Sequence, residues 1–246
     1  MQATLYIIGV GPGDPDLLTI KALNVLRHCP VVATPKALAH GHSTALSIVQ
    51  QALPMAETHE KEIMELHFPM KKIQLGQEPD PEVLHAWQDA AGRIFAILSQ
   101  GRDVAFPTLG DPAIYSTGYY LYATMMEMHP EVRVQFVPGI SAMSSCSATT
   151  HTPICLGDDM LAVIPATFSD NRLRQILETF DTIVLMKVHR VMDHLIGLLL
   201  ELNLLDKATL VERVGMADER VLADLSVIDI QAGQVHYFST IIVRKK

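Results

Sequence analysis

Residues 9–14 read GVGPGD and overlap the last two positions of a short apolar run at residues 4–10 (TLYIIGV). The run is β-branched and apolar, which predicts a buried strand, and the glycines and proline behind it predict a sharp turn. A helix is expected next, over residues 16–28, because leucines and isoleucine recur there at nearly helical spacing. A strand that turns on glycines into a helix is the opening unit of an α/β fold.

The rest of the chain extends this pattern. Further strands are expected at residues 31–34, 62–68, 103–108, 132–137, 161–165, 182–188, 208–214, 221–225 and 235–243. Helices are expected at residues 43–53, 81–98, 116–129, after 138–141, and at 170–180 and 190–203. The alternation predicts an α/β fold of two lobes, residues 1–118 and 119–246, with a mainly parallel amino-terminal sheet and a mixed carboxyl-terminal sheet. A single large sheet is the alternative.

Composition excludes several classes of protein. The 246 residues are 49% hydrophobic and 19% charged, which argues against disorder. Lys and Arg number 19 and Asp and Glu 27, so the formal charge of −8 predicts no nucleic-acid partner. No apolar run approaches the ~20 residues of a membrane span, and the amino terminus lacks the basic start of a signal peptide.

Metal and disulfide chemistry are not predicted either. Cys29, Cys146 and Cys155 form no CxxC pair, and the 11 histidines, including His40 and His42, show no ligand spacing. We therefore expect no bound metal and a cytoplasmic protein.

The first glycine turn invites a dinucleotide-binding interpretation, but the details disfavour it. Its spacing is GxGxG rather than GxGxxG, and Pro12 removes a backbone donor from the supposed phosphate cradle. The stretch about 20 residues further on offers no acidic residue to hold a ribose. A plain strand-to-helix turn, with Asp14 capping the helix, remains the alternative.

Two later turns also follow predicted strands. They are residues 108–115 (TLGDPAIY) and 138–142 (PGISA). Ligands of open α/β sheets bind at the carboxyl ends of strands, so both are candidate ligand loops. An ordinary Gly-Asp-Pro turn and close helix packing are the structural alternatives. No GxSxG elbow supports a hydrolase.

Taken together, residues 9–22 (GVGPGDPDLLTIKA), 110–117 (GDPAIYST) and 138–142 resemble the tetrapyrrole (corrin and porphyrin) methylase family. Further segments make the chain most similar to the branch that methylates C-20 of precorrin-2 or cobalt-factor II. These segments are residues 68–70 (FPM), 163–167 (VIPAT), 184–188 (VLMKV), 212–216 (ERVGM) and 237–240 (YFST).

The resemblance implies a homodimeric enzyme that binds S-adenosylmethionine in a cleft between its lobes and transfers the methyl group to a tetrapyrrole in cobalamin biosynthesis. The cofactor-binding residues that it implies are Pro12, Leu109, Gly110, Asp111, Ile114, Tyr115, Ser141, Ala142, Met186, Gly215, Met216 and Thr240. Ser141 and Ala142 are expected from the second lobe. Leu109 is a departure, because many relatives carry glycine there.

Methyl transfer from a sulfonium needs no nucleophilic residue, and the sequence identifies no base. Asp103, Asp111 and Tyr115 are expected near the site, as structural or ligand-positioning groups. Lys36, Arg102 and Arg190 are candidates to meet substrate carboxylates. The alternatives are another corrin-ring methyltransferase, a diphthine synthase, or a non-catalytic nucleotide-binding module. Whether the acceptor carries cobalt stays open.

Overall fold

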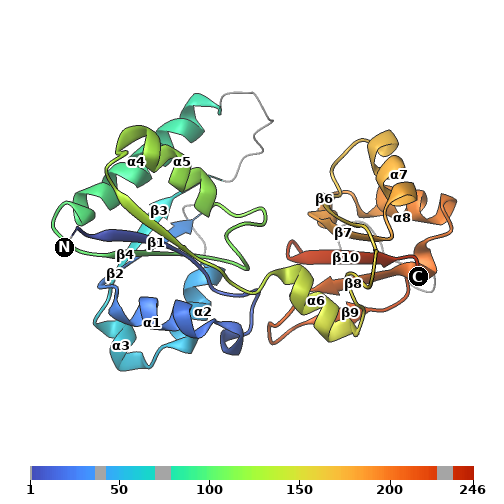
Figure 1. Cartoon of the computed structure of the whole chain (residues 1–246), viewed down its shortest axis with the longest axis horizontal. Coiled ribbons are helices and arrows are strands. Elements are labelled where there is room, and N and C mark those ends of the chain that lie inside the picture. Colours follow the sequence, from blue (N-terminus) through green and yellow to red (C-terminus); the bar gives the residue numbers. More distant parts are fainter. Residues whose placement is uncertain (1, 37–42, 70–78, 226–234) are drawn as a thin grey trace. The chain divides into compact units, whose positions relative to one another are not determined.

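The chain folds into two compact units, Met1–Ser141 and Ala142–Lys246 (Figure 1). The structure is a computed structural model and describes residues 2–36, 43–69, 79–225 and 235–246. The expected boundary after residue 118 differs from this division, because β5 (Arg133–Val137) pairs in parallel with β1 (Thr4–Gly9). A strand within a sheet shares its main-chain hydrogen bonds with its neighbour, so β5 belongs to the first unit.

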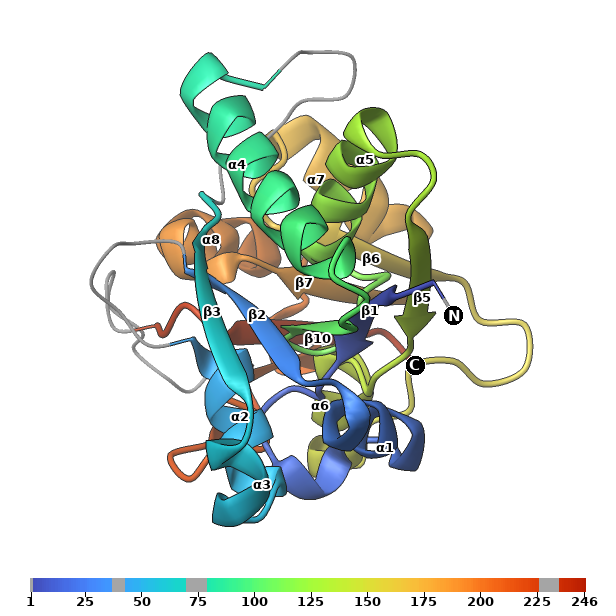
Figure 2. The same cartoon turned by 90° about the vertical axis from the view of Figure 1, so that its left-hand side faces the viewer.

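The first unit is a five-stranded sheet of order β3-β2-β4-β1-β5 in which every pairing is parallel. The other strands are β2 (Val31–Lys36), β3 (Glu62–His67) and β4 (Val104–Thr108). Figures 1 and 2 show α1 (Ile20–His28), α2 (Thr44–Ala52) and α3 (Met55–His59) on one face of the sheet, and α4 (Pro81–Leu98) and α5 (Gly118–Met128) on the other. The mainly parallel sheet is thus confirmed.

Two features of this unit differ from expectation. The helix expected from residue 16 begins at Ile20, where the Thr19 hydroxyl caps it by accepting from the Ala22 N–H. The preceding Pro15–Leu17 forms a separate 3-10 turn, capped by Asp14. Helix α3 was not expected, since five residues are too few to show helical periodicity.

Alternate residues of β1 enter two different cores. Leu5 and Ile7 pack with Trp87 and other side chains of α4, whereas Ile8 packs with Leu26 of α1 on the opposite face. A strand covered on both faces must be apolar at nearly every position, which is why β1 reads as a continuous hydrophobic run.

The second unit is a mixed sheet of order β6-β7-β10-β8-β9. Only β6 and β7 pair in parallel, and the other pairings are antiparallel. The strands are β6 (Leu161–Pro165), β7 (Thr182–Met186), β8 (Ala208–Glu212), β9 (Arg220–Leu222) and β10 (Ser239–Arg244). The strand expected over residues 235–243 thus begins only at Ser239.

Helices cover both faces of this second sheet. Leu173 of α7 (Asp170–Thr179) and Leu195 of α8 (Met192–Glu201) pack on one face. Cys146 of α6 (Ala142–Thr150) packs against Val184 on the other face. Across the described ranges of both units, no helix has the length and apolar character that crossing a membrane requires.

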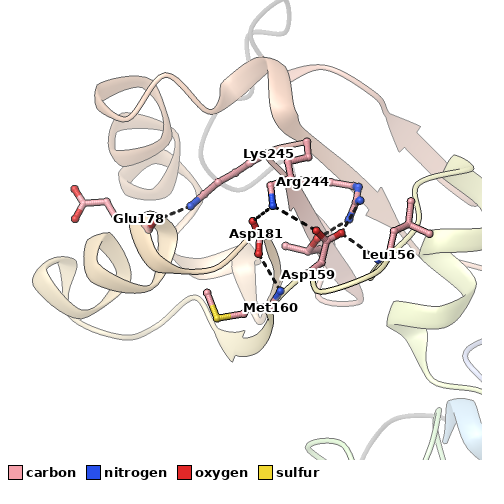
Figure 3. A network of polar contacts seen from close by, with 9 residues as sticks. Leu156, Asp159, Met160, Glu178, Asp181, Arg244 and Lys245 are labelled. Carbon is pink, nitrogen blue, oxygen red and sulfur yellow. Dashed lines mark hydrogen bonds and ion pairs between the residues drawn. The ribbon is translucent and has the colours of Figure 1, made fainter.

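A polar network ties the end of β10 to the loop before β6 (Figure 3). Arg244 donates to the Asp159 carboxylate at 2.8 Å and to the Thr182 hydroxyl at 2.9 Å. The same carboxylate accepts from the Leu156 N–H at 3.0 Å. The hydrogen bond from Arg244 is the main reason that the pKa of Asp159 lies below its ordinary value.

This lowered pKa predicts acid sensitivity. A carboxylate with a depressed folded-state pKa stabilises the fold fully above its unfolded pKa, about 3.9, and loses that contribution as the pH falls through the folded value. Asp159→Asn should therefore lower Tm at pH 7, and its deficit relative to wild type should shrink below about pH 4. Thermal unfolding followed by circular dichroism measures this. Asp158→Asn, at the exposed neighbouring position, is the control. A pH-independent deficit contradicts the electrostatic explanation.

Candidate functional site

The three glycine loops meet at one edge of the first sheet. Because β1, β4 and β5 run parallel, their carboxyl ends share that edge. The N–H of Gly110 donates to the Gly11 carbonyl at 2.7 Å, and the N–H of Gly11 donates to the Gly110 carbonyl at 3.3 Å. This pair of hydrogen bonds joins the first two loops main chain to main chain.

The third loop packs against the first two loops where glycines meet. A Cβ on Gly9 would lie 2.7 Å from the carbonyl oxygen of Gly110 and 2.7 Å from the Cα of Gly139. A Cβ on Gly139 would lie 2.8 Å from the Cα of Gly9 and closer still to the Gly110 oxygen. These neighbours are backbone atoms that cannot turn aside, so only glycine permits this approach. Gly110 itself has φ 73°, a left-handed conformation that also favours glycine.

The Asp111 carboxylate links the second loop to the third by hydrogen bonds. One oxygen accepts from the Ala113 N–H at 2.8 Å, and the other accepts from the Gly139 N–H at 2.9 Å. Both oxygens are therefore engaged by main-chain donors. This leaves Asp111 to meet a ligand chiefly through its main chain, as the family resemblance implies.

The remaining predicted site residues of this unit lie within the same three loops. Pro12 is buried, whereas Leu109 and Ile114 are half-buried. Tyr115 is 46% exposed with φ 50°, and burial of part of its side chain raises the pKa of its hydroxyl above the ordinary value. Ser141 is buried and belongs to the first unit, not to the second as expected.

The second unit gathers its predicted residues at one edge of its own sheet. Met186 ends β7 and lies directly opposite Thr240 of the antiparallel strand β10. Gly215 and Met216 lie in the turn after β8, whose carboxyl end is at this same edge. Ala142 begins α6 and packs on the face of this sheet near Met186.

A buried carboxylate holds the turn that carries Gly215. Glu212 is 1% exposed, forms an ion pair with Arg220, and accepts from the His236 N–H at 2.6 Å. Burial by itself raises the pKa of Glu212, but the hydrogen bonds from Arg220 and His236 outweigh burial and leave that pKa below its ordinary value. The Glu219 carboxylate accepts from the Gly215 N–H at 2.7 Å and completes the turn.

Two expectations are wrong, because their residues lie at the opposite edge of the first sheet. Asp103 precedes β4, and its carboxylate accepts from the N–H of Thr4, the first residue of β1, at 2.7 Å. Arg102 lies beside it and pairs with Glu62 at the start of β3. Neither side chain is at the carboxyl ends of the strands.

The other two candidate cations lie at carboxyl ends. Lys36 ends β2 and contacts Glu65 at 2.6 Å. Arg190 is exposed in the 3-10 turn Val188–Arg190 that follows β7. Met70, His40 and His42 lie outside the described residues. No group of three or more potential metal ligands occurs within the described part of the chain.

Sequence reasoning missed the aromatic side chains around α5. Tyr119 and Tyr120 are 49% and 41% exposed at the start of that helix, close in sequence to the Gly110 loop. The signal was present, because four of the chain's six tyrosines fall within residues 115–122. The rings on which they stack, Phe136 and Trp87, belong to other elements, so the crowding alone did not define a role.

Comparison with known proteins assigns the fold and its loops to a family. The family model described as Tetrapyrrole (Corrin/Porphyrin) Methylases matches residues 4–228. The chain belongs to this family. The resemblance of the three glycine loops is thereby confirmed.

Two curated relatives bear on the branch of the family. The cobalt-precorrin-2 C(20)-methyltransferase of Salmonella typhimurium is 30% identical over 246 residues, covering 100% of this chain and 98% of that protein. The cobalamin biosynthesis protein CobIJ of Mycobacterium tuberculosis is 34% identical over 238 residues, covering 97% of this chain. The chain spans only 45% of the length of CobIJ.

Solved structures support the fold. A cobalt precorrin-4 methyltransferase superposes with a TM-score of 0.70 at 19% identity, covering 98% of this chain and 94% of that one. A uroporphyrin-III C-methyltransferase from Thermus thermophilus, complexed with S-adenyl homocysteine, superposes with a TM-score of 0.61 at 20% identity, covering 98% and 92%.

The glycine contact makes a direct prediction. Gly139→Ala should lower the free energy of unfolding of the first unit by about 1–3 kcal/mol, because the added methyl group meets backbone atoms. Gly92→Ala in α4, where a Cβ meets nothing within 4 Å, should instead be neutral or stabilising by up to ~1 kcal/mol. Urea-induced unfolding distinguishes the two variants. Equal stabilities would contradict the contact.

Proposed function

We propose that this protein is an S-adenosylmethionine-dependent methyltransferase that methylates C-20 of precorrin-2 or cobalt-factor II in cobalamin biosynthesis. The observation that carries the proposal is its similarity to a cobalt-precorrin-2 C(20)-methyltransferase over almost the whole of both chains. The convergence of the glycine loops on one edge of a parallel sheet supports the proposal, because ligands of open α/β sheets bind at the carboxyl ends of strands.

The first unit fits S-adenosylmethionine chemically. Its loops offer main-chain groups beyond the strand ends and half-buried apolar side chains at Leu109 and Ile114, while both oxygens of the Asp111 carboxylate already accept hydrogen bonds from main-chain N–H groups. Such a lining suits the adenosine and the uncharged methylene groups of the cofactor. When bound, the cofactor supplies an electrophilic methyl group. The contribution that the family resemblance implies for Ala142, Met186, Gly215, Met216 and Thr240 stays a prediction.

The chain's own part in the reaction is to bind and orient. Both Asp111 oxygens already accept main-chain hydrogen bonds, and Asp103 lies at the opposite edge of the sheet. A tyrosine hydroxyl is protonated at neutral pH in any case, and burial raises the pKa of Tyr115 further. None of the three therefore acts as a proton acceptor in this proposal. Alignment of acceptor carbon and methyl group is the main source of acceleration, and positioning of this kind can be worth ~7–11 kcal/mol.

The acceptor carries several carboxylates. We propose that Lys36 meets one of them, because it ends β2 at the carboxyl edge of the first sheet. We further propose a homodimer in the cytoplasm, as the family resemblance implies. Size-exclusion chromatography with light scattering tests the oligomeric state.

The decisive experiment is turnover with S-adenosylmethionine labelled in its methyl carbon, offered with precorrin-2 and with cobalt-factor II under anaerobic conditions. NMR of the product should place the labelled methyl group on C-20. Label on another ring carbon would indicate a different corrin methyltransferase. Cofactor binding without transfer to either acceptor would indicate a non-catalytic module.

A substitution in the loop tests the cofactor site. Ile114→Glu should weaken binding of S-adenosylhomocysteine at least about ten-fold, because it brings bulk and charge against the ligand, and calorimetry measures the affinity. It leaves the left-handed glycine at position 110 untouched, so folding should persist. Ile20→Glu, at a position 79% exposed in α1, is the matched control and should bind normally. Unchanged affinity in Ile114→Glu would move the site elsewhere.

A further inference from the structure

Tyrosines crowd the beginning of α5, which is held firmly at the carboxyl edge of the first sheet. The Ser116 and Thr108 hydroxyls hydrogen-bond at 2.7 Å, and the Ser116 oxygen accepts from the Gly118 N–H at 3.0 Å. A Cβ on Gly118 would lie 2.6 Å from a side-chain methyl of Ile7, so the helix approaches β1 closely. The first turn of α5, which carries Tyr120, is therefore fixed beside the Gly110 loop.

Three aromatic rings form a stack that runs from the core to the surface. Phe68 and Trp87 stack with centroids 5.4 Å apart and planes at 14°, and Trp87 and Tyr120 stack at 5.0 Å and 21°. The exposed fraction rises along the stack from 0% at Phe68 through 4% at Trp87 to 41% at Tyr120. The Trp87 indole N–H donates to the Pro69 carbonyl at 3.2 Å, which fixes the middle ring.

The stack ends at the exposed ring of Tyr120. Among the described residues, no second ring stacks on Tyr120 beyond Trp87. A ring that is backed by stacked aromatics and is 41% exposed is suited to bind another flat, unsaturated ring.

Lys36 ends β2, the strand paired with β3, which leads into Phe68. The Phe68 N–H donates to the Lys36 carbonyl at 2.9 Å, so the two main chains are adjacent at the carboxyl edge of the sheet. The Lys36 side chain itself alternates to the other face of the sheet, that of Thr34 and α2, where it pairs with Glu65 at 2.6 Å. Tyr119 lies outside the stack of Phe68, Trp87 and Tyr120, because its ring stacks instead on Phe136 of the edge strand β5 at 4.5 Å.

We propose that Tyr120 is a substrate-positioning residue whose outer face stacks on the conjugated ring face of the tetrapyrrole acceptor. The proposal rests on the proposed function, since it takes the acceptor to be a tetrapyrrole. Trp87 and Phe68 hold the Tyr120 ring in place.

Acceptor binding without turnover tests this. Cobalt-factor II is titrated into the protein saturated with S-adenosylhomocysteine, and binding is followed by the fluorescence of Trp87, the single tryptophan of the chain. Tyr120→Ala should weaken acceptor binding about ten-fold, as expected for the loss of one stacked ring, and Tyr120→Phe should restore it. Tyr119→Ala should bind the acceptor as wild type does. Calorimetry should give an unchanged affinity for S-adenosylhomocysteine in every variant.

Tyr120→Leu separates stacking from bulk and protects the test if the alanine variant unfolds. It fills much of the same volume without an aromatic face, so its acceptor binding should also be weak. Binding at wild-type strength in Tyr120→Ala or Tyr120→Leu overturns the proposal. So does weaker S-adenosylhomocysteine binding with unchanged acceptor binding, which would assign the ring to adenine. A Tyr120→Ala variant whose only change is its oligomeric state would assign the ring to a subunit interface. If the wild-type protein binds no tetrapyrrole, the proposed function fails as well, which distinguishes that failure from the others.

Discussion

The main-chain contact between Gly9, Gly110 and Gly139 is the constraint on which the rest of the first unit depends. Three chain segments that leave three parallel strands come together there without a single intervening side chain. The approach is held by the Gly11–Gly110 hydrogen bonds and by the Asp111 carboxylate, which satisfies donors in two loops. A lining built of backbone suits the uncharged parts of a ligand, because main-chain N–H and C=O groups recognise them without adding charge.

Each unit brings its predicted site residues to one edge of its sheet, but the two units do so by different strand pairing. In the first, parallel pairing brings all carboxyl ends to one edge, so three loops meet automatically. In the second, antiparallel pairing places the beginning of β10 beside the ends of β7 and β8. Buried Glu212 then holds the turn after β8, where Gly215 lies. The turns that carry the predicted site residues are thus supported by specific polar contacts in both units.

Charge gives the proposed substrate a particular difficulty. The chain carries a formal charge of −8, so its overall field repels a polycarboxylate. The carboxylates at the candidate sites are largely engaged internally, Asp111 by main-chain donors and Glu212 by Arg220 and His236. Stacking on a neutral ring such as Tyr120 adds affinity without depending on that field, and it leaves only the acceptor's rim to be met by a few cations.

The sequence by itself determined the strands, most helices, the parallel-then-mixed order of the sheets and the three glycine loops, because these follow from short-range periodicity and from residues that the backbone requires locally. The misplacement of Asp103 came from nearness in numbering to Gly110, although an intervening extended strand of five residues spans ~16 Å. Only the tertiary structure decided that β5 belongs to the first unit, that Asp111 reaches Gly139, and that Phe68, Trp87 and Tyr120 form one stack. Each of these joins segments far apart in the chain, and no local pattern encodes which distant surfaces will pack together.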